Sequence, residues 1–116
     1  MKLVIICSDG RVLLKETTGS YEDMNAILTG VKVLEDCNPS SWFRTLADPP
    51  PSLDKVTVNV KGFGEIWLIG AFKIYKCKAP CKLEVEPDTY IIARKVNEKL
   101  IYEKTILILK PVEIKV

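Results

Sequence analysis

Four cysteines are the residues in this chain whose type and spacing could do chemistry. Cys77 and Cys81 enclose three residues in the segment CKAPC, while Cys7 and Cys37 each stand alone. A structural zinc site usually takes its thiolates from two close pairs, and a thioredoxin-like motif has two residues between its cysteines. The sequence therefore favours neither a metal site nor a redox motif, and we expect no bound cofactor.

Disulfide bonds compete with free thiols at both pairs. A Cys77–Cys81 bond would close a short loop and stabilise the chain by about 2 kcal/mol on the chain-entropy account. A Cys7–Cys37 bond would close a longer loop, but only the even number of cysteines supports it. In a reducing cytosol cysteines normally stay free, with hyperthermophiles as the exception. We expect the Cys77–Cys81 bond ahead of the Cys7–Cys37 bond.

Catalytic chemistry has little support in the composition. The chain contains no histidine, which is the commonest general base and the commonest metal ligand. Ser40, Ser41 and Ser52 lie close to prolines and match no nucleophile motif. The segment KGFGE has two glycines but lacks the following helix and the Lys-Ser/Thr pair of a phosphate-binding loop. We therefore expect a non-catalytic protein.

Positive charge gathers in the second half of the chain. Residues 1–54 hold five basic and eight acidic residues, whereas residues 55–116 hold twelve and seven. A basic patch beside Tyr75 and Tyr90 would suit nucleic acid, and its candidate residues are Lys73, Lys76, Lys78, Lys82, Arg94, Lys95 and Lys99. Lysines on strands also protect sheet edges from aggregation, which is the interpretation we favour.

The first third of the chain predicts a hairpin and a helix. Lys2–Cys7 is an apolar strand, and Asp9-Gly10 before the next apolar run predicts a type I′ turn. Ser20 is a natural N-cap, and Gly30 can end the helix in a left-handed conformation. The apolar face of this helix should pack on the hairpin through Met24, Ile27, Leu28 and Val31.

The middle of the chain is expected to be irregular. Ser40–Leu46 is interpreted as one short helical turn, with Trp42 and Phe43 as core anchors under a loop. An exposed aromatic pair used for binding is the alternative. Pro49-Pro50-Pro51 favours a stiff polyproline II spacer between two parts of the chain.

Strand patterns dominate from Lys55 onward. Residues 56–60 alternate apolar and polar, and residues 65–76 predict one long strand that can bend at Gly70. CKAPC is interpreted as the connection to the next strand, and turns are expected at Pro87-Asp88 and Asn97-Glu98. Val112–Val116 should form a last edge strand.

The predicted fold is α+β: an N-terminal β-hairpin and short helix, then a mainly antiparallel β-sandwich. Turn signals every 8–12 residues in the second half favour a sandwich. We expect one compact domain over residues 1–116, with the hairpin and helix in residues 1–46. The proline-rich connection spans residues 47–54, and the sandwich portion spans residues 55–116.

The second half also resembles the PEGA family of small β-sandwich modules. The resemblance runs from Gly64 to Lys110. Ala79-Pro80 stands in the x-Pro position, and Pro87 to Tyr90 stand in the Pro-Gly-Thr-Tyr position. Asp88 replaces the family's glycine, and the Gly-Tyr before the last strand is missing. The resemblance implies a non-catalytic sandwich used for anchoring or protein contact, and it supplies no functional residues.

The expected function is a non-catalytic structural or protein-interaction module that binds a protein partner or self-associates through the edge strand Val112–Val116. A small nucleic-acid-binding protein is the alternative. The absence of glutamine, with abundant Lys, Glu, Ile and Val, indicates a heat-adapted source, archaeal or viral. No stretch approaches the length of a membrane span and no signal peptide is recognised, so a cytoplasmic location is the default expectation.

Overall fold

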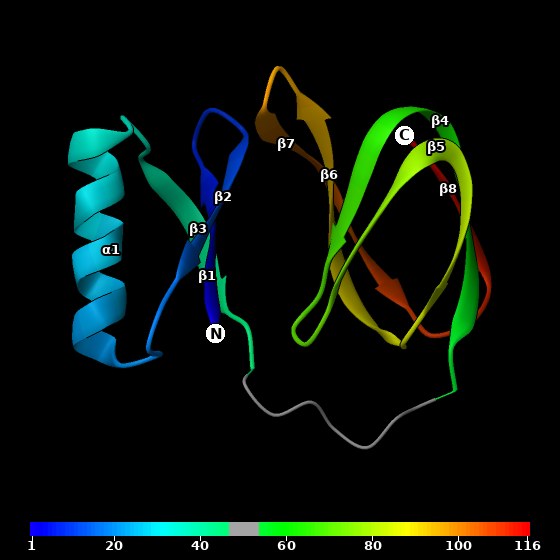
Figure 1. Cartoon of the computed structure of the whole chain (residues 1–116), viewed down its shortest axis with the longest axis horizontal. Coiled ribbons are helices and arrows are strands. Elements are labelled where there is room, and N and C mark those ends of the chain that lie inside the picture. The colour runs from blue at the N-terminus through cyan, green and yellow to red at the C-terminus, as the bar shows by residue number, and fades with distance from the viewer. Residues whose placement is uncertain (47–53) are drawn as a thin grey trace.

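The structure is a computed structural model that describes residues 1–46 and 54–116 (Figure 1). The proline-rich connection expected at 47–54 therefore lies outside the described residues except for Asp54. The elements in chain order are β1 (Lys2–Cys7), β2 (Arg11–Glu16), α1 (Tyr21–Leu34), β3 (Pro39–Arg44), β4 (Val56–Ile69), β5 (Ile74–Val85), β6 (Asp88–Val96), β7 (Lys99–Ile108) and β8 (Val112–Lys115).

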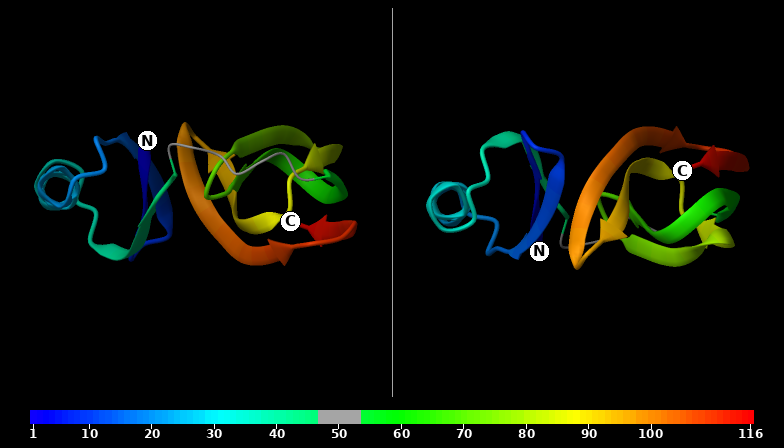
Figure 2. Two further views of the ribbon diagram at one scale, coloured as in Figure 1. Left: turned by 90° about the horizontal axis from the view of Figure 1, so that it is seen from below. Right: turned by 90° about the horizontal axis from the view of Figure 1, so that it is seen from above.

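Pairing between neighbouring strands links all eight described strands into one mixed sheet. The order is β3-β1-β2-β7-β6-β4-β5, and β8 pairs in parallel with the first part of β4. Every other pair is antiparallel. A β-rich fold, with one helix among the described residues, is thus confirmed. The two packed sheets of a sandwich are not confirmed, because the pairing is continuous and the part from β4 to β8 curls on itself (Figure 2).

Three layers result from this topology. Helix α1 covers one face of the short sheet β3-β1-β2, and the curled sheet, defined here as β4 to β8, lies on the other face (Figures 1 and 2). Strand β1 is therefore covered on both faces, and Leu3, Val4 and Ile5 are fully buried. This explains why β1 is a continuous apolar run, since a strand with one wet face would alternate.

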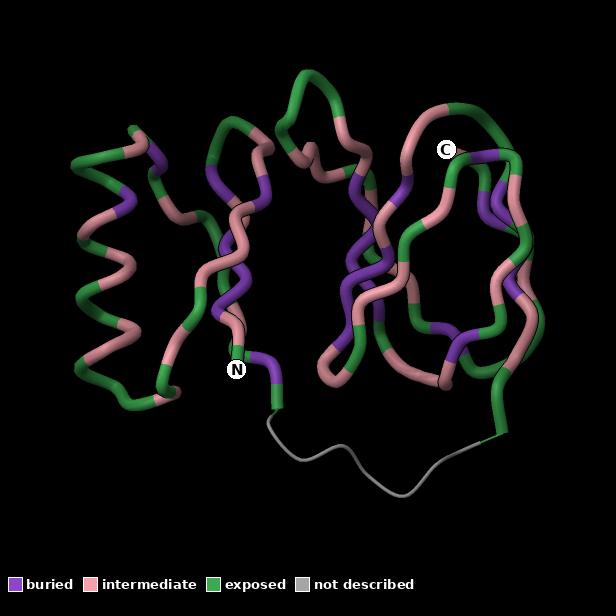
Figure 3. The backbone as a smooth tube through the Cα atoms, in the orientation of Figure 1, coloured by how far each residue is buried: buried purple, intermediate pink, exposed green. Residues whose placement is uncertain are grey.

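Apolar side chains fill the spaces between and within these layers. Leu3 and Ile5 pack with Val31 under α1, whereas Val4 packs with Ile69 against the curled sheet. A third core lies inside the curled sheet, and its largest members are Tyr90, Ile66, Leu68, Ile92, Ile108 and Ile114. Figure 3 shows the buried residues concentrated in β1 and the curled sheet, with fewer in α1.

The N-terminal hairpin and helix are confirmed, with two corrections of detail. The hairpin loop is Ser8-Asp9-Gly10, and Gly10 donates to the Cys7 carbonyl with φ +95°. Asp9 does not have a positive φ, so the expected type I′ turn is wrong; the loop is a three-residue one with a left-handed glycine. Ser20 caps α1 as expected, but Gly30 does not end it, because the helix continues to Leu34.

The short helical turn expected at Ser40–Leu46 is wrong. Pro39–Arg44 forms strand β3, which pairs with β1. Hydrogen bonds to a neighbouring strand more than thirty residues away override the weak local preference of this segment. Phe43 does pack in a core, but Trp42 is 46% exposed, so it is not the core anchor that was expected.

Two expectations for the second half are also wrong. The long strand expected over residues 65–76 is interrupted, because Gly70 donates to the Lys73 carbonyl and closes the turn between β4 and β5. The segment CKAPC is not a connection between strands but lies within β5. Pro80 faces an irregular stretch of β4 between Val60 and Gly64, where a residue without an N–H is tolerated.

Candidate functional site

Strand β3 forms one free edge of the sheet. In the described sheet, β3, β5 and β8 each pair with a single neighbour. Strand β5 carries the exposed Lys76, Lys78 and Lys82, and β8 has only four residues. Charges and shortness are the usual protection of an edge against further pairing. The exposed residues Ser40, Ser41 and Trp42 in the middle of β3 carry no charge.

The free backbone groups of β3 can be assigned from the ladder. The Thr45 N–H donates to the Lys2 carbonyl over 2.8 Å, so Thr45 faces β1. In an antiparallel pair the direction of these groups alternates along the strand. The N–H and C=O groups of Trp42 and Arg44 therefore point away from β1, toward the space where another strand would pair.

A groove runs between β3 and α1, and it is called the helix-side groove here. Its wider part has a volume of about 510 Å³ and lies between Asn25, Leu28, Thr29 and Lys32 on α1 and residues 39–42 on β3. A smaller hollow of about 110 Å³ beside Tyr21 and Met24 shares Asn25, Leu28 and Trp42 with it. Trp42 thus forms a wall common to both parts.

The N-terminal end of α1, at one end of this groove, is held by a compact polar network. The Ser20 hydroxyl accepts from the Asp23 N–H at 3.1 Å. The Thr17 hydroxyl and the Thr18 N–H donate to the Asp23 carboxylate at 2.6 and 3.0 Å. These bonds, with the Thr17 hydroxyl contributing most, lower the pKa of Asp23 below its ordinary value. The Arg44 guanidinium donates to the Gly19 carbonyl and so ties β3 to the same turn.

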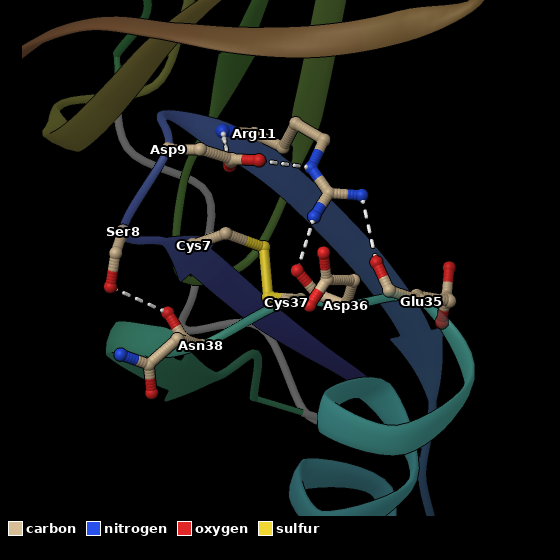
Figure 4. A network of polar contacts seen from close by, with 8 residues as sticks. All are labelled: Cys7, Ser8, Asp9, Arg11, Glu35, Asp36, Cys37 and Asn38. Carbon is tan, nitrogen blue, oxygen red and sulfur yellow. Dashed lines mark hydrogen bonds and ion pairs between the residues drawn. A yellow bond between two sulfur atoms is a disulfide. The ribbon is translucent and has the colours of Figure 1, made fainter.

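The C-terminal end of α1 is fixed to the first hairpin (Figure 4). Arg11 donates to the carbonyls of Glu35 and Asp36 at 3.0 and 2.9 Å, and to the Asp9 carboxylate at 2.8 Å. The Arg11 N–H and guanidinium lower the pKa of Asp9. The positive charge of Arg11 also suits this end of α1, because the C-terminal end of a helix dipole is negative.

Both cysteine pairs lie at disulfide distance. The Cα atoms of Cys7 and Cys37 are 5.3 Å apart, and both residues are buried beside the Arg11 network (Figure 4). The Cα atoms of Cys77 and Cys81 are 6.3 Å apart, where five residues of straight strand would put them about 13 Å apart. Strand β5 is therefore sharply bent between these two cysteines.

The predicted basic residues are divided among different places. Lys76, Lys78 and Lys82 are exposed along β5, with Lys76 over the ring of Trp67. Three others lie close to acidic side chains: Lys73 pairs with Glu86, Arg94 with Glu103, and Lys95 with Glu65 and Glu98. Hydrogen bonding to Glu86 raises the pKa of Lys73. In the described structure, β5 is the one strand on which several of these cations, Lys76, Lys78 and Lys82, form no ion pair.

The polar residues of α1 in the helix-side groove were missed by sequence reasoning. The helix pattern pointed only to the apolar residues Met24, Ile27, Leu28 and Val31, and polar residues such as Asn25, Thr29 and Lys32 on an amphipathic helix are usually solvated. Their importance depends on β3 lying beside them, and β3 was expected to be helical. Two uncharged serines before an aromatic pair were the only signal in the sequence.

Neither a family model, a curated protein nor a solved structure matches this chain. The resemblance of the second half to the PEGA family stays a prediction. Across residues 1–46 and 54–116, no helix has the length and apolar character needed to cross a membrane. The same residues contain no cluster of three or more carboxylate, thiol or imidazole side chains arranged for a metal ion.

Proposed function

We propose that this protein is a non-catalytic interaction module that binds an extended segment of a partner protein as an added strand on β3. The observation that carries the proposal is the free edge of β3, uncharged at Ser40–Trp42, beside the helix-side groove. In strand addition, main-chain hydrogen bonds supply affinity and adjoining pockets supply specificity. Trp42 and Arg44 present the main-chain groups, and α1 provides the wall.

The proposed occupant is a single extended segment. Helix α1 lies on one side of β3 and the curled sheet on the other (Figure 2). A strand placed on the β3 edge therefore lies between α1 and the curled sheet. A single extended segment fits between these two elements more readily than a folded domain does. Both ends of α1 are anchored, at Ser20 and at Glu35, so the groove is formed before binding and little ordering is required.

The first test is selection from a phage-displayed library of random ten-residue peptides, followed by fluorescence anisotropy with an enriched peptide. Trp42→Ala should weaken binding at least about tenfold, because aromatic residues in a groove are typical binding hot spots. Phe63→Ala is the matched control, since Phe63 is 68% exposed on the curled sheet, away from β3. Equal effects of the two substitutions would contradict the proposed site.

Backbone methylation tests strand pairing directly. Two versions of the enriched peptide carry N-methyl groups at alternate positions, one on the odd residues and one on the even residues. Only one set of amides faces β3 in a paired strand, so one version should lose binding and the other should retain it. Loss in both versions, or retention in both, would exclude strand addition.

Two other occupants are separate outcomes of these experiments. A dimer seen by light scattering at high concentration, and abolished by Trp42→Ala, would show that β3 pairs with a second copy. Binding to a single-stranded oligonucleotide at low salt, without enrichment of any peptide, would replace the proposal with the nucleic-acid alternative, because phosphate attraction is strongest there. Charge reversal at Lys78 and Lys82 would then locate that binding on β5.

A further inference from the structure

A second hollow lies on the opposite face of β3, between it and the curled sheet, and it is called the sheet-side hollow here. Its volume is about 300 Å³, at the lower end of the range for ligand pockets. Ile6, Phe43, Ile69 and Ile91 are its large apolar lining residues. Ser41, which faces the same side as Phe43, leaves the hollow open at the edge of β3 because its side chain is small.

The carboxylate and one hydroxyl that line this hollow already have hydrogen-bond partners. Asp88 is its one charged lining residue in the described structure, and its carboxylate accepts from the N–H groups of Ala71 and Thr89 at 2.9 and 2.7 Å. The Thr105 hydroxyl lies 2.8 Å from the Tyr102 hydroxyl. A ligand with a charged group would gain no free counter-charge here and would lose its hydration. The hollow therefore suits a neutral apolar group.

We infer that the sheet-side hollow receives apolar side chains of the strand bound to β3, so that the partner segment alternates apolar and polar residues. This inference rests on the proposed function. Successive side chains of a strand point to opposite faces. On β3, Ser41 and Phe43 pair with Ile6 and Val4 on the sheet side, while Trp42 pairs with Ile5 on the helix side. An added strand follows the same alternation.

The helix-side groove determines the other half of the pattern. Asn25, Thr29 and Lys32 line it, and Lys32 has no ion pair among the residues described. An antiparallel segment would run from Arg44 toward Pro39, which places its C-terminal part near Lys32. The segment therefore carries aliphatic or aromatic residues at every second position, and polar or acidic residues between them.

The test uses a fluorescein-labelled peptide of about nine residues in which isoleucine alternates with threonine and aspartate. A control peptide has the same composition with the isoleucines grouped together. A third peptide has aspartate in place of the two central isoleucines. We expect the alternating peptide to bind at least about tenfold more tightly than either of the others. Equal affinity of the three would overturn the inference.

A substitution that fills the hollow tests the same inference from the side of the protein. Thr89→Trp places a large side chain at its rim, on an exposed strand position that accepts aromatic residues. Thr89→Trp should weaken binding of the alternating peptide at least about tenfold. Thr57→Trp, on β4 outside the hollow, should leave the affinity for this peptide within about twofold of the wild-type value. If Thr89→Trp does not fold, the comparison of the three peptides decides the question by itself.

Failure of this inference can be told apart from failure of the proposed function. If library-selected peptides bind and Trp42→Ala weakens them, but Thr89→Trp leaves their affinity unchanged, strand addition stands and the sheet-side hollow is not used. If the selected peptides show neither the Trp42→Ala effect nor the difference between the methylated versions, the proposed function itself is wrong.

Discussion

The guanidinium group of Arg11 donates to the main-chain carbonyl of Asp36 over 2.9 Å, across 25 residues of sequence. The same guanidinium reaches the Glu35 carbonyl at 3.0 Å. Carbonyls at the end of a helix have no partner within it, so a long side chain from another element can satisfy them. This contact joins the first hairpin to α1 and so helps to hold one end of the helix-side groove.

Removing the Arg11 side chain should destabilise the protein. The Arg11 side chain is only 19% exposed and Arg11→Ala loses its charge-assisted hydrogen bonds, so we expect the free energy of unfolding to fall by roughly 2 kcal/mol. Lys15→Ala is the control, because the Lys15 side chain is more exposed than that of Arg11, at 34%, and makes a single ion pair with Glu35 at 2.6 Å. That pair should contribute less than about 1 kcal/mol. Urea denaturation measures both values, and equal losses would contradict the role of Arg11.

The two cysteine pairs should both be oxidised in protein isolated without reductant. Intact mass spectrometry should then show a mass about 4 Da below that of the reduced chain. On the chain-entropy account, Cys7→Ala with Cys37→Ala should cost about 3–4 kcal/mol, because the pair is separated by 30 residues. Cys77→Ala with Cys81→Ala should cost about 2 kcal/mol, because the separation is 4 residues. Four titratable thiols in the unreduced protein would show that neither bond forms.

Asp23 should make the free energy of unfolding depend on pH in the acidic range. Its pKa is lowered in the folded state, chiefly by the Thr17 hydroxyl. The unfolded chain therefore binds the proton more tightly, so the contribution of Asp23 is present above its ordinary pKa of 3.8 and is lost as pH falls through the lower folded value. Asp23→Asn should lower stability at neutral pH and flatten the decline below about pH 4.

Thr17→Val should reproduce part of the Asp23→Asn behaviour, because it removes the hydroxyl that donates to the carboxylate. Thr29→Val is the matched control: the Thr29 hydroxyl donates to a main-chain carbonyl, that of Asn25, rather than to a carboxylate. Denaturation curves at several pH values between about 2 and 7 would measure these slopes. A Thr17→Val variant with the full wild-type slope would contradict the assignment.

Two glycines should respond in opposite directions to replacement by alanine. Gly30 lies inside α1, and a Cβ added there would meet no atom within 4 Å, so Gly30→Ala should stabilise the protein by about 0.5–1 kcal/mol. Gly62 has φ +126°, and a Cβ there would meet the carbonyl of Val116. Gly62→Ala should destabilise by at least about 1 kcal/mol. Thermal unfolding of the two variants gives the signs, and a stable Gly62→Ala variant would contradict this prediction.

Local signals predicted the elements whose stabilising contacts are close in sequence. The hairpin from β1 to β2 needs a short loop with a left-handed glycine, and α1 begins at a serine whose hydroxyl caps it. The alternation of Val58 and Val60 with polar residues likewise predicted the buried face at the start of β4. The wrong details, at Asp9 and Gly30, concern how these elements turn and end.

The sequence could not predict the free edge of β3 or the hollows beside it. The Lys2–Thr45 contact spans 43 residues, and the four consecutive residues Ser40 to Phe43 have no periodicity that distinguishes a strand from a turn. The sequence also could not predict which residues of the basic patch would lie together. Arg94 and Lys95 are adjacent in sequence but point to opposite faces of β6, and Glu65 and Glu103 come close to them only through strand pairing.

The sequence by itself determined a β-rich chain with one capped, amphipathic helix and a first hairpin, because period, turn residues and caps act over a few neighbouring residues. Only the tertiary structure decided that β1 is covered on both faces, that CKAPC lies within a bent strand, and that β3 lies at an edge between α1 and the curled sheet. Each of these depends on which distant strands pair. Pairing energy comes from contacts between residues far apart in the chain, and no local pattern encodes the partner.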